Sequence, residues 1–172
     1  MDLSIASTNT GSPTLEFRLF SDKDDVVKLN SILQSAYRPL AEAGMRYAAS
    51  HEDVEATRSN IEKGECHIVI ADGEPIACVM LRPPGNATGP DWYSQPGVAT
   101  FGRFAVAPDF QKLGNRIEER AKEMGATEIA LDTSEHAQHL IKMYADRGYR
   151  FIQYHKWEIT NYRSVVLSKE LK

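Results

Sequence analysis

The chain has 172 residues, enough for one domain with its own hydrophobic core and without disulfide or metal staples. Its net charge of −4, from 20 basic and 24 acidic residues, provides no broad electrostatic footprint for nucleic acid or an anionic membrane, so we expect neither partner. The longest apolar runs are far shorter than the ~20 residues that a membrane span needs.

The first residues lack the basic start and the apolar core of a signal peptide, and the stretch from Thr8 to Pro13 is polar and rich in turn formers. We therefore expect residues 1–14 to be a disordered lead-in and residues 15–172 to be a single domain. Cys66 and Cys78 both lie in strand-like apolar runs, which favours buried thiols over a disulfide. Together these features predict a cytoplasmic protein.

The first predicted elements are a strand and two helices. Leu15–Phe20 alternates apolar and polar residues, as a half-buried strand does. Ser21 or Asp22 can cap a helix whose apolar residues from Val26 to Ala36 fit a 3.6-residue period, and we expect Pro39 to end it. A second helix is predicted over His51–Lys63, stopping at Gly64.

A hairpin follows, because Asp72-Gly73 separates two β-rich runs, Glu65–Ala71 and Pro75–Leu81. The Pro/Gly-rich stretch Pro83–Gly97 is long for a loop, a length typical of functional or mobile segments. The simpler interpretation is a tolerated insertion whose aromatic residues, Trp92 and Tyr93, cover a small apolar patch.

The rest of the chain alternates strands and helices before two final strands. The predicted elements are a strand over 98–106, a helix from Phe110 or Asn115 to Met124, a strand over 127–132, a helix from Ser134 or Glu135 to Arg147, and strands over Tyr149–Ile159 and Arg163–Leu171. The order βααββ and then βαβαββ predicts an α/β or α+β fold, a mixed sheet with helices on its faces.

The segment from Phe104 to Gly114 combines a strand, a turn and the start of a helix. Such a turn can direct backbone N–H groups, with a helix N-terminus behind them, at a phosphate. Pro108 ends the strand ladder, and Gly114 permits close approach of the backbone or a positive φ. The segment is therefore a candidate anion site.

Three motifs in this order resemble a known family, the GNAT superfamily of acetyl-CoA-dependent N-acetyltransferases. Val106–Gly114 resembles its acetyl-CoA signature, V-x-P-x-x-Q-x-x-G, and Glu128–Thr133 continues the likeness. Met143–Tyr149 is similar to the family's helix end, L-Y-x-x-x-G-F. The resemblance spans roughly Leu15 to Lys169. It implies a GNAT fold, with a central mixed, mostly antiparallel sheet of about seven strands flanked by about four helices.

The resemblance also implies how acetyl-CoA would bind and react. The backbone of Phe104, Ala105 and Val106 would pair with the pantetheine arm like an added strand. A backbone N–H of this strand would hold the oxyanion formed when the acceptor amine attacks the thioester directly. Tyr144 would protonate the departing thiolate, since a phenol with pKa near ~10 is neutral at pH 7. The alternative for Tyr144 is a packed aromatic residue at the helix end.

The pyrophosphate would lie against four backbone amides, those of Gln111, Lys112, Leu113 and Gly114. Here the chain departs from the family, because about seven residues are missing after Gly114, roughly two helical turns. Such a loss keeps the helix in phase. We therefore expect the residues that face the sheet to be Ile117, Ala121 and Met124.

Three explanations of this departure stay open. Asn115 and Arg116 rebuild a shorter anion site, with Arg116 as a phosphate partner. The shortening has instead weakened the binding of CoA. Or the protein has further residues at this junction. A second departure is Ala137, which stands where many relatives place an Asn that contacts the cofactor arm.

A general base is not evident, because the strand before the signature carries no carboxylate. Asp132, Glu135 and His136 are candidates, although a helix cap or a solvated side chain is the simpler interpretation of each. Arg103 recognises an acidic group on the acceptor or is simply exposed. His136 and His139 share a helix face without a further ligand, so we assign no metal.

The sequence thus predicts an acetyl-CoA-dependent N-acetyltransferase acting on a primary amine of a small molecule or peptide. The alternative is a catalytically inactive binding or regulatory protein of GNAT fold. Acceptor specificity is expected from the Tyr37–His51 connection, which carries Arg38, Glu42, Arg46 and Tyr47, and from the loop with Trp92 and Tyr93. A homodimer paired through the two terminal strands also stays open.

Overall fold

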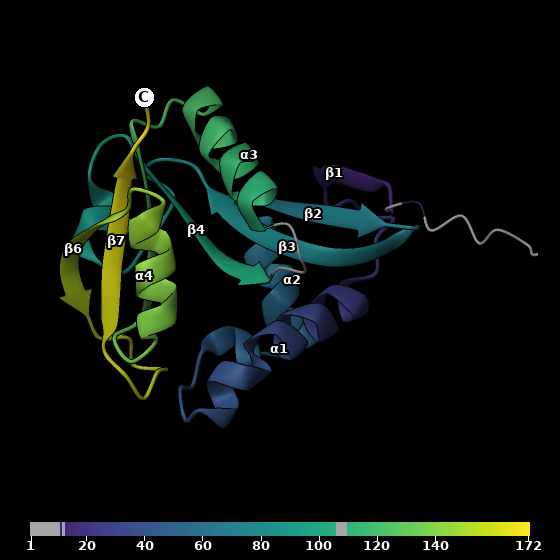
Figure 1. Cartoon of the computed structure of the whole chain (residues 1–172), viewed down its shortest axis with the longest axis horizontal. Helices are drawn as coiled ribbons and strands as arrows, with labels where there is room; N and C mark the ends of the chain where they lie inside the picture. Colours follow the sequence, from purple (N-terminus) through teal and green to yellow (C-terminus); the bar gives the residue numbers. More distant parts are fainter. Residues whose placement is uncertain (1–10, 12, 106–109) are drawn as a thin grey trace, which may run out of the picture.

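The computed structural model describes residues 11, 13–105 and 110–172, which form a seven-stranded sheet in the order β1-β2-β3-β4-β5-β7-β6 (Figure 1). The strands are β1 (Leu15–Leu19), β2 (Glu65–Ala71), β3 (Glu74–Arg82), β4 (Val98–Ala105), β5 (Glu128–Ser134), β6 (Arg150–His155) and β7 (Ser164–Glu170). The helices are α1 (Val26–Glu42), α2 (Val54–Glu62), α3 (Phe110–Glu123) and α4 (Gln138–Asp146), with short 3-10 helices at η1 (Ala48–Ser50) and η2 (Asp91–Ser94). Every strand pair is antiparallel except β4–β5, so the predicted mixed, mostly antiparallel sheet with four flanking helices is confirmed.

Two hydrophobic cores lie on opposite faces of the sheet. On one face α3 and α4 pack on β3 and β4, and the expected sheet-facing residues of α3 are confirmed: Ile117 and Ala121 are buried, and Met124 packs at their edge. On the other face α1 contributes Leu29 and Leu33 to a core with β2 and β3. The alternation of side chains along each strand produces these two faces.

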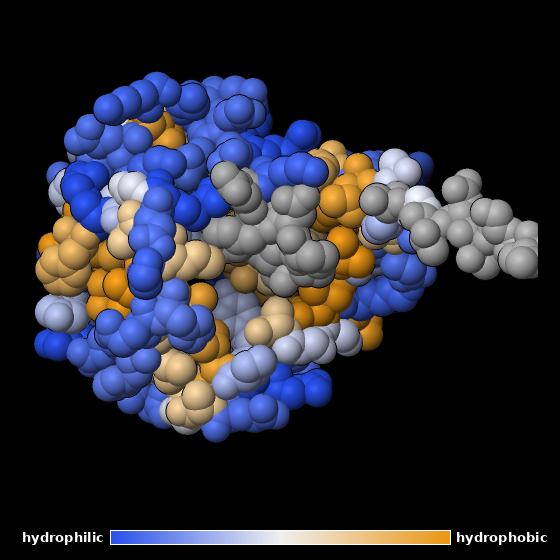
Figure 2. Space-filling model, in the orientation of Figure 1, coloured by the Kyte–Doolittle hydropathy of each residue, from blue (hydrophilic) through white to orange (hydrophobic). Residues whose placement is uncertain are grey.

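Helix α3 covers only part of its face of the sheet. Figure 2 shows hydrophilic residues over α3 and hydrophobic residues over β2 and β3 beside it. Phe17 and Ile76, at the edge of this core, are only partly buried. The helix runs without a break through Gly114 and Asn115, so the short junction is accommodated inside one helix.

Several predicted boundaries were wrong for identifiable reasons. Pro39 does not end α1, which continues to Glu42, because a proline near a helix end removes only one backbone hydrogen bond. The cap of α1 is Asp25, whose carboxylate accepts a hydrogen bond from the backbone N–H of Val27 at 2.8 Å. Asp53 caps α2 in the same way, so this helix begins at Val54.

Two further predictions concern the end of the chain and the cysteines. β6 ends at His155 rather than Ile159, and a loop over 156–163 connects it to β7. Cys66 and Cys78 are both free and buried, as expected. In the described part of the chain, no helix combines the length and the apolar character that a membrane crossing requires.

The parallel pair β4–β5 is short, and this feature positions the site. The two strands pair only from Val98 to Thr100 and from Glu128 to Ala130, although β4 continues to Ala105 and β5 to Ser134. On its other side β4 stays paired with β3 across one bulge, where Arg103 has a φ of 50°. Beyond Thr100, therefore, the sheet opens between β4 and β5.

Candidate functional site

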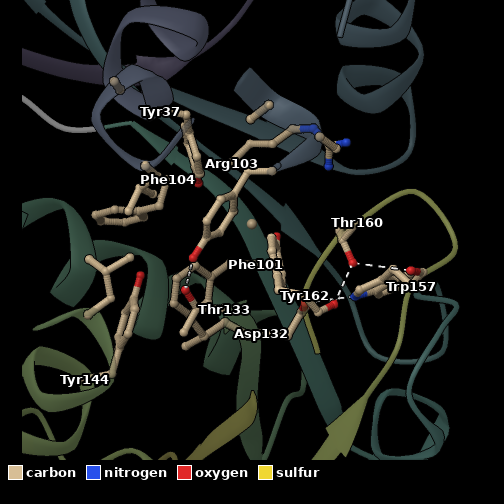
Figure 3. A pocket seen from close by; sticks show the side chains of 18 of the residues that line it. Tyr37, Phe101, Arg103, Phe104, Asp132, Thr133, Tyr144, Trp157, Thr160 and Tyr162 are labelled. Atoms are coloured by element: carbon tan, nitrogen blue, oxygen red, sulfur yellow. Dashed lines mark hydrogen bonds between the residues drawn. The ribbon is translucent and has the colours of Figure 1, made fainter. Parts of the chain in front are cut away.

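A cavity of about 560 Å³ lies where β4 and β5 separate, a size typical of small-molecule sites. Phe101 and Phe104 of β4 line it together with Thr133 of β5, Tyr144 of α4 and Tyr37 of α1 (Figure 3). The cavity therefore draws its wall from both layers of helices and from the opening in the sheet.

Tyr144 is buried in this wall, with 6% of its surface exposed. Its ring contacts those of Phe101 and Tyr149, at centroid distances of 6.1 and 5.5 Å. Burial raises the pKa of the Tyr144 phenol above the ordinary tyrosine value. The phenol is therefore protonated at neutral pH, the form that a general acid requires.

The structure places the predicted cofactor residues at the end of β4 and at the start of α3. Phe104 and Ala105 are the last two residues of β4, whereas Val106 lies outside the described residues. Gln111 and Lys112 belong to the first turn of α3, whose N-terminus carries a partial positive charge. The side chain of Leu113 is buried in the core, so only its backbone can serve a ligand.

Three neighbouring residues of α3 make contacts that the sequence did not suggest. Gly114 has no positive φ, and a Cβ there would lie 2.5 Å from Nη2 of Arg147, the flexible end of that side chain. The same Nη2 donates a hydrogen bond to Asn115 Oδ1 at 3.1 Å. The guanidinium of Arg116 lies over the ring of Phe17, 5.8 Å from its centroid.

Of the three candidate bases, Asp132 is the one that lines the cavity. Its Oδ1 accepts a hydrogen bond from Tyr93 Oη at 2.7 Å, and its Oδ2 accepts one from Trp157 Nε1 at 2.8 Å. Glu135 instead pairs with Arg163, whose hydrogen bond holds the pKa of that carboxyl below its usual value. His136 is not among the described residues that line the cavity.

The loop with Trp92 and Tyr93 packs as the simpler interpretation predicted. Tyr93 is buried against Val98 and Ala130, and Trp92 is packed at the edge of this cluster. In addition, the hydrogen bond from Tyr93 to Asp132 ties the loop to β5 beside the cavity. This loop therefore both covers an apolar patch and positions Asp132 in the cavity wall.

The connection after α1 contributes aromatic residues to the wall. Tyr47 Oη lies 2.7 Å from Thr133 Oγ1 and accepts a hydrogen bond from the backbone N–H of Ser134 at 3.0 Å. The ring centroids of Tyr37 and Tyr162 lie 5.4 and 4.9 Å from that of Tyr47. The other expected specificity residues of this connection, Arg38, Glu42 and Arg46, are not among the described lining residues.

Arg103 lines the cavity and is not exposed, because it forms an ion pair with Glu52. Its Nε and Nη2 donate to the two carboxylate oxygens of Glu52 at 2.8 and 2.9 Å, and the Glu52 side chain is 7% exposed. Sequence reasoning missed Glu52, because an acidic residue just before a helix is usually solvated. It also missed Arg82 at the end of β3 and Trp157 in the last loop, which both line the cavity.

Comparison with known proteins identifies the fold and the family. Residues 27–149 match the family described as "Acetyltransferase (GNAT) family". S-(2-succino)cysteine N-acetyltransferase of Bacillus subtilis is 31% identical over 144 residues, covering 77% of this chain and 82% of the relative.

Solved structures show the same fold at low sequence identity. A GNAT family acetyltransferase from Elizabethkingia anophelis with acetyl-CoA bound has a TM-score of 0.65 at 16% identity, over 91% of this chain and 98% of that one. A putative acetyltransferase from Salmonella typhimurium with acetyl-CoA has a TM-score of 0.64 at 14% identity, over 92% of this chain and 94% of that one.

The chain belongs to the GNAT acetyltransferase family. The resemblance expected from the three motifs is confirmed, and with it the class of activity, an N-acetyltransferase that uses acetyl-CoA as cosubstrate. None of these comparisons favours the inactive alternative. Within residues 11, 13–105 and 110–172, no group of three or more His, Cys, Asp and Glu residues is arranged to hold a metal ion.

Proposed function

We propose that this protein transfers the acetyl group of acetyl-CoA to the primary amine of a small amino acid, inside the cavity between β4 and β5. One observation carries the proposal: Tyr144, a buried phenol, and Asp132, a carboxylate, line the same cavity where the sheet opens. The relative from Bacillus subtilis, named for an acceptor that is an amino acid derivative, supports this class of acceptor.

The opening in the sheet fits the pantetheine arm of acetyl-CoA. In the described register β4 pairs with β5 only from Val98 to Thr100, and in this proposal the backbone of Phe104 and Ala105, beyond that pairing, holds the arm as an added strand. Val106 belongs to the same predicted segment. The first turn of α3, with Gln111, Lys112, Leu113 and Gly114, offers a helix N-terminus for the pyrophosphate, and Asn115 and Arg116 follow it.

The proposed step is a direct acyl transfer. The amine nitrogen attacks the thioester carbonyl carbon, the new C–N bond forms, and the C–S bond breaks. Tyr144 gives its proton to the departing thiolate and is reprotonated from solvent. The acceptor ammonium loses one proton to Asp132 before attack, and its nitrogen loses a second proton to water as the amide forms. The products are the N-acetylated acceptor and CoA.

The proposal is tested by measuring release of CoA thiol from acetyl-CoA in the presence of a panel of primary amines. The panel contains S-(2-succino)cysteine, common amino acids and short peptides. Release that depends on an amino acid, with the N-acetyl product seen by mass spectrometry, is the expected result. No release above the hydrolysis background with any member of the panel would overturn the proposal.

Two finer proposals concern assembly and location. We propose a homodimer through β6, supported by the exposed Phe151 and Tyr154 on this edge strand, whose rings lie 5.1 Å apart. Light scattering of the protein and of Phe151→Lys tests it: an unchanged mass would count against this interface. A cytoplasmic location is also proposed, supported by the two free, buried cysteines.

A further inference from the structure

Two side chains of opposite charge line the cavity without a charged partner of their own. They are Arg82, the last residue of β3, and Asp132 of β5. Within the part of the chain that the structure describes, no acidic group forms an ion pair with Arg82 and no basic group forms one with Asp132. Charges withdrawn from water are normally paired, so an unpaired charge in a cavity wall indicates a charged ligand.

Arg82 is half-buried and is held in place by one neutral contact. Its Nη2 donates a hydrogen bond to Asn60 Oδ1 at 3.2 Å. Asn60 is itself buried, and its Nδ2 donates to the backbone carbonyl of Ala56 at 2.9 Å. The amide of Asn60 therefore presents its oxygen to Arg82 and fixes the guanidinium at the cavity wall.

Asn60, the partner of Arg82, also lies 3.4 Å through its Nδ2 from a carboxylate oxygen of Glu52, but this carboxylate is already engaged. Glu52 accepts both hydrogen bonds of the bidentate pair with Arg103. Arg103 is also close enough to lower the pKa of Arg82, after the larger effect of burial, yet an arginine stays charged at every ordinary pH. Glu52 therefore compensates the charge of Arg103 and not that of Arg82, and this side of the cavity carries an excess positive charge.

Asp132 presents the complementary charge. Both of its oxygens accept hydrogen bonds from neutral donors, Tyr93 Oη and Trp157 Nε1. These bonds fix the orientation of the carboxylate but leave its charge uncompensated. Each carboxylate oxygen has a second lone pair, so Asp132 can still accept a hydrogen bond from a ligand.

Strand register places the two charges on one face of the sheet. Arg82 pairs with Thr100, and Thr100 pairs with Ala130, so these three side chains share a face. Asp132 is two residues beyond Ala130 and therefore belongs to the same face. Two inter-strand spacings, about 10 Å, separate the backbones of β3 and β5 at the level of Thr100.

We propose that the cavity binds its acceptor as a zwitterion, with Arg82 holding a carboxylate of the acceptor and Asp132 facing its amine. This inference rests on the proposed function and assigns the two residues that recognise the opposite charges of its amino acid acceptor. The guanidinium provides a planar, two-pronged donor that matches a carboxylate. Asp132 faces the ammonium nitrogen of the acceptor and accepts its proton before attack.

The test compares one acceptor with and without its negative charge. KM and kcat are measured with S-(2-succino)cysteine and with the same compound after its carboxylates are esterified, and also for the best amino acid of the panel and its amide. We expect the charged acceptor to have a KM lower by about tenfold to a hundredfold. This comparison uses the wild-type protein and does not depend on a variant that folds.

Arg82→Gln should then raise KM for the charged acceptor by a similar factor and leave KM for the ester nearly unchanged. Arg82→Lys should restore part of the difference, because it keeps the charge but not the two-pronged geometry. Arg58→Gln, on the exposed side of α2 and outside the cavity, is the matched control and should behave as wild type.

The outcomes separate the inference from the proposed function. If esters and acids react with equal KM, or if Arg82→Gln affects both equally, the zwitterion site is wrong while the acetyltransferase assignment stands. If no amine releases CoA thiol, the proposed function itself is wrong. Calorimetric titration of S-(2-succino)cysteine into wild-type protein and Arg82→Gln gives the same comparison without turnover, and equal affinity would also overturn the inference.

Discussion

The two sides of β4 serve different purposes, although they belong to one strand. Toward β3 the strand is paired from Thr100 to Ala105 across a single bulge, so its backbone is bonded into the sheet on that side. Toward β5 it is paired only from Val98 to Thr100, and the side chains beyond line the cavity. The difference shows that the cavity arises because the pairing of β4 with β5 ends at Thr100, while the pairing of β4 with β3 continues.

The largest expected effect is a fall in kcat, from a substitution in the cavity between β4 and β5. Tyr144→Phe keeps the packed ring and removes the phenolic proton, so we expect kcat to fall by roughly 10²- to 10⁴-fold, the range for loss of a general acid. Steady-state kinetics with the best acceptor checks this. Tyr154→Phe on β6, exposed and outside the cavity, is the control. A Tyr144→Phe enzyme with wild-type kcat would remove Tyr144 from the chemistry and leave it as a packed aromatic residue.

Substitutions in the core beside the paired β3 side of β4 should change the stability of the protein rather than its catalysis. Leu81 of β3 is fully buried in the core under α3, and Leu81→Ala should lower the free energy of unfolding by about 2–5 kcal/mol. Urea denaturation measures this. Leu19→Ala on β1 removes an exposed side chain and should cost far less. Equal losses for the two variants would contradict the view that the β3 side of β4 is a continuous core.

Asp132 is expected to matter for stability as well as for the reaction, because its carboxylate binds two loops beside the cavity between β4 and β5. Asp132→Ala leaves Tyr93 Oη and Trp157 Nε1 without their acceptor, and we expect a loss of about 2 kcal/mol in the free energy of unfolding. Thermal denaturation checks the loss. The double variant with Trp157→Phe should lose less than the sum of the two single variants. Additive losses would indicate that Asp132 does not bind the last loop.

Local sequence signals predicted the fold better than they predicted the cavity wall. Alternation in the strands and the phase of Ile117 and Ala121 are local patterns, and tertiary packing agrees with them. Glu52 and Arg103 meet across 51 positions in the sequence, and neither has a local motif that indicates the other. Trp157 was expected inside a strand. Charged pairs and loop contacts of this kind depend on the assembled sheet, and the local sequence does not encode them.

The smallest expected effect lies away from both sides of β4, at the start of α1. Arg18 donates two hydrogen bonds of 2.7 Å to the two carboxylate oxygens of Asp24 and holds the pKa of that carboxyl well below its usual value of 3.8. A depressed folded-state pKa means that the stabilisation is present above pH 4 and is lost as the pH falls below the unfolded value.

Asp24→Asn should therefore lower the free energy of unfolding at pH 7 by less than about 1 kcal/mol, since the pair is close to solvent. It should also make the loss of stability below pH 4 shallower than in wild type. Urea denaturation from pH 7 to pH 3 measures both, with Asp22→Asn as the exposed control. Parallel curves for wild type and Asp24→Asn would show that the pair does not contribute. A change in KM of the folded Asp24→Asn enzyme at pH 7 would contradict the separation of this pair from the cavity.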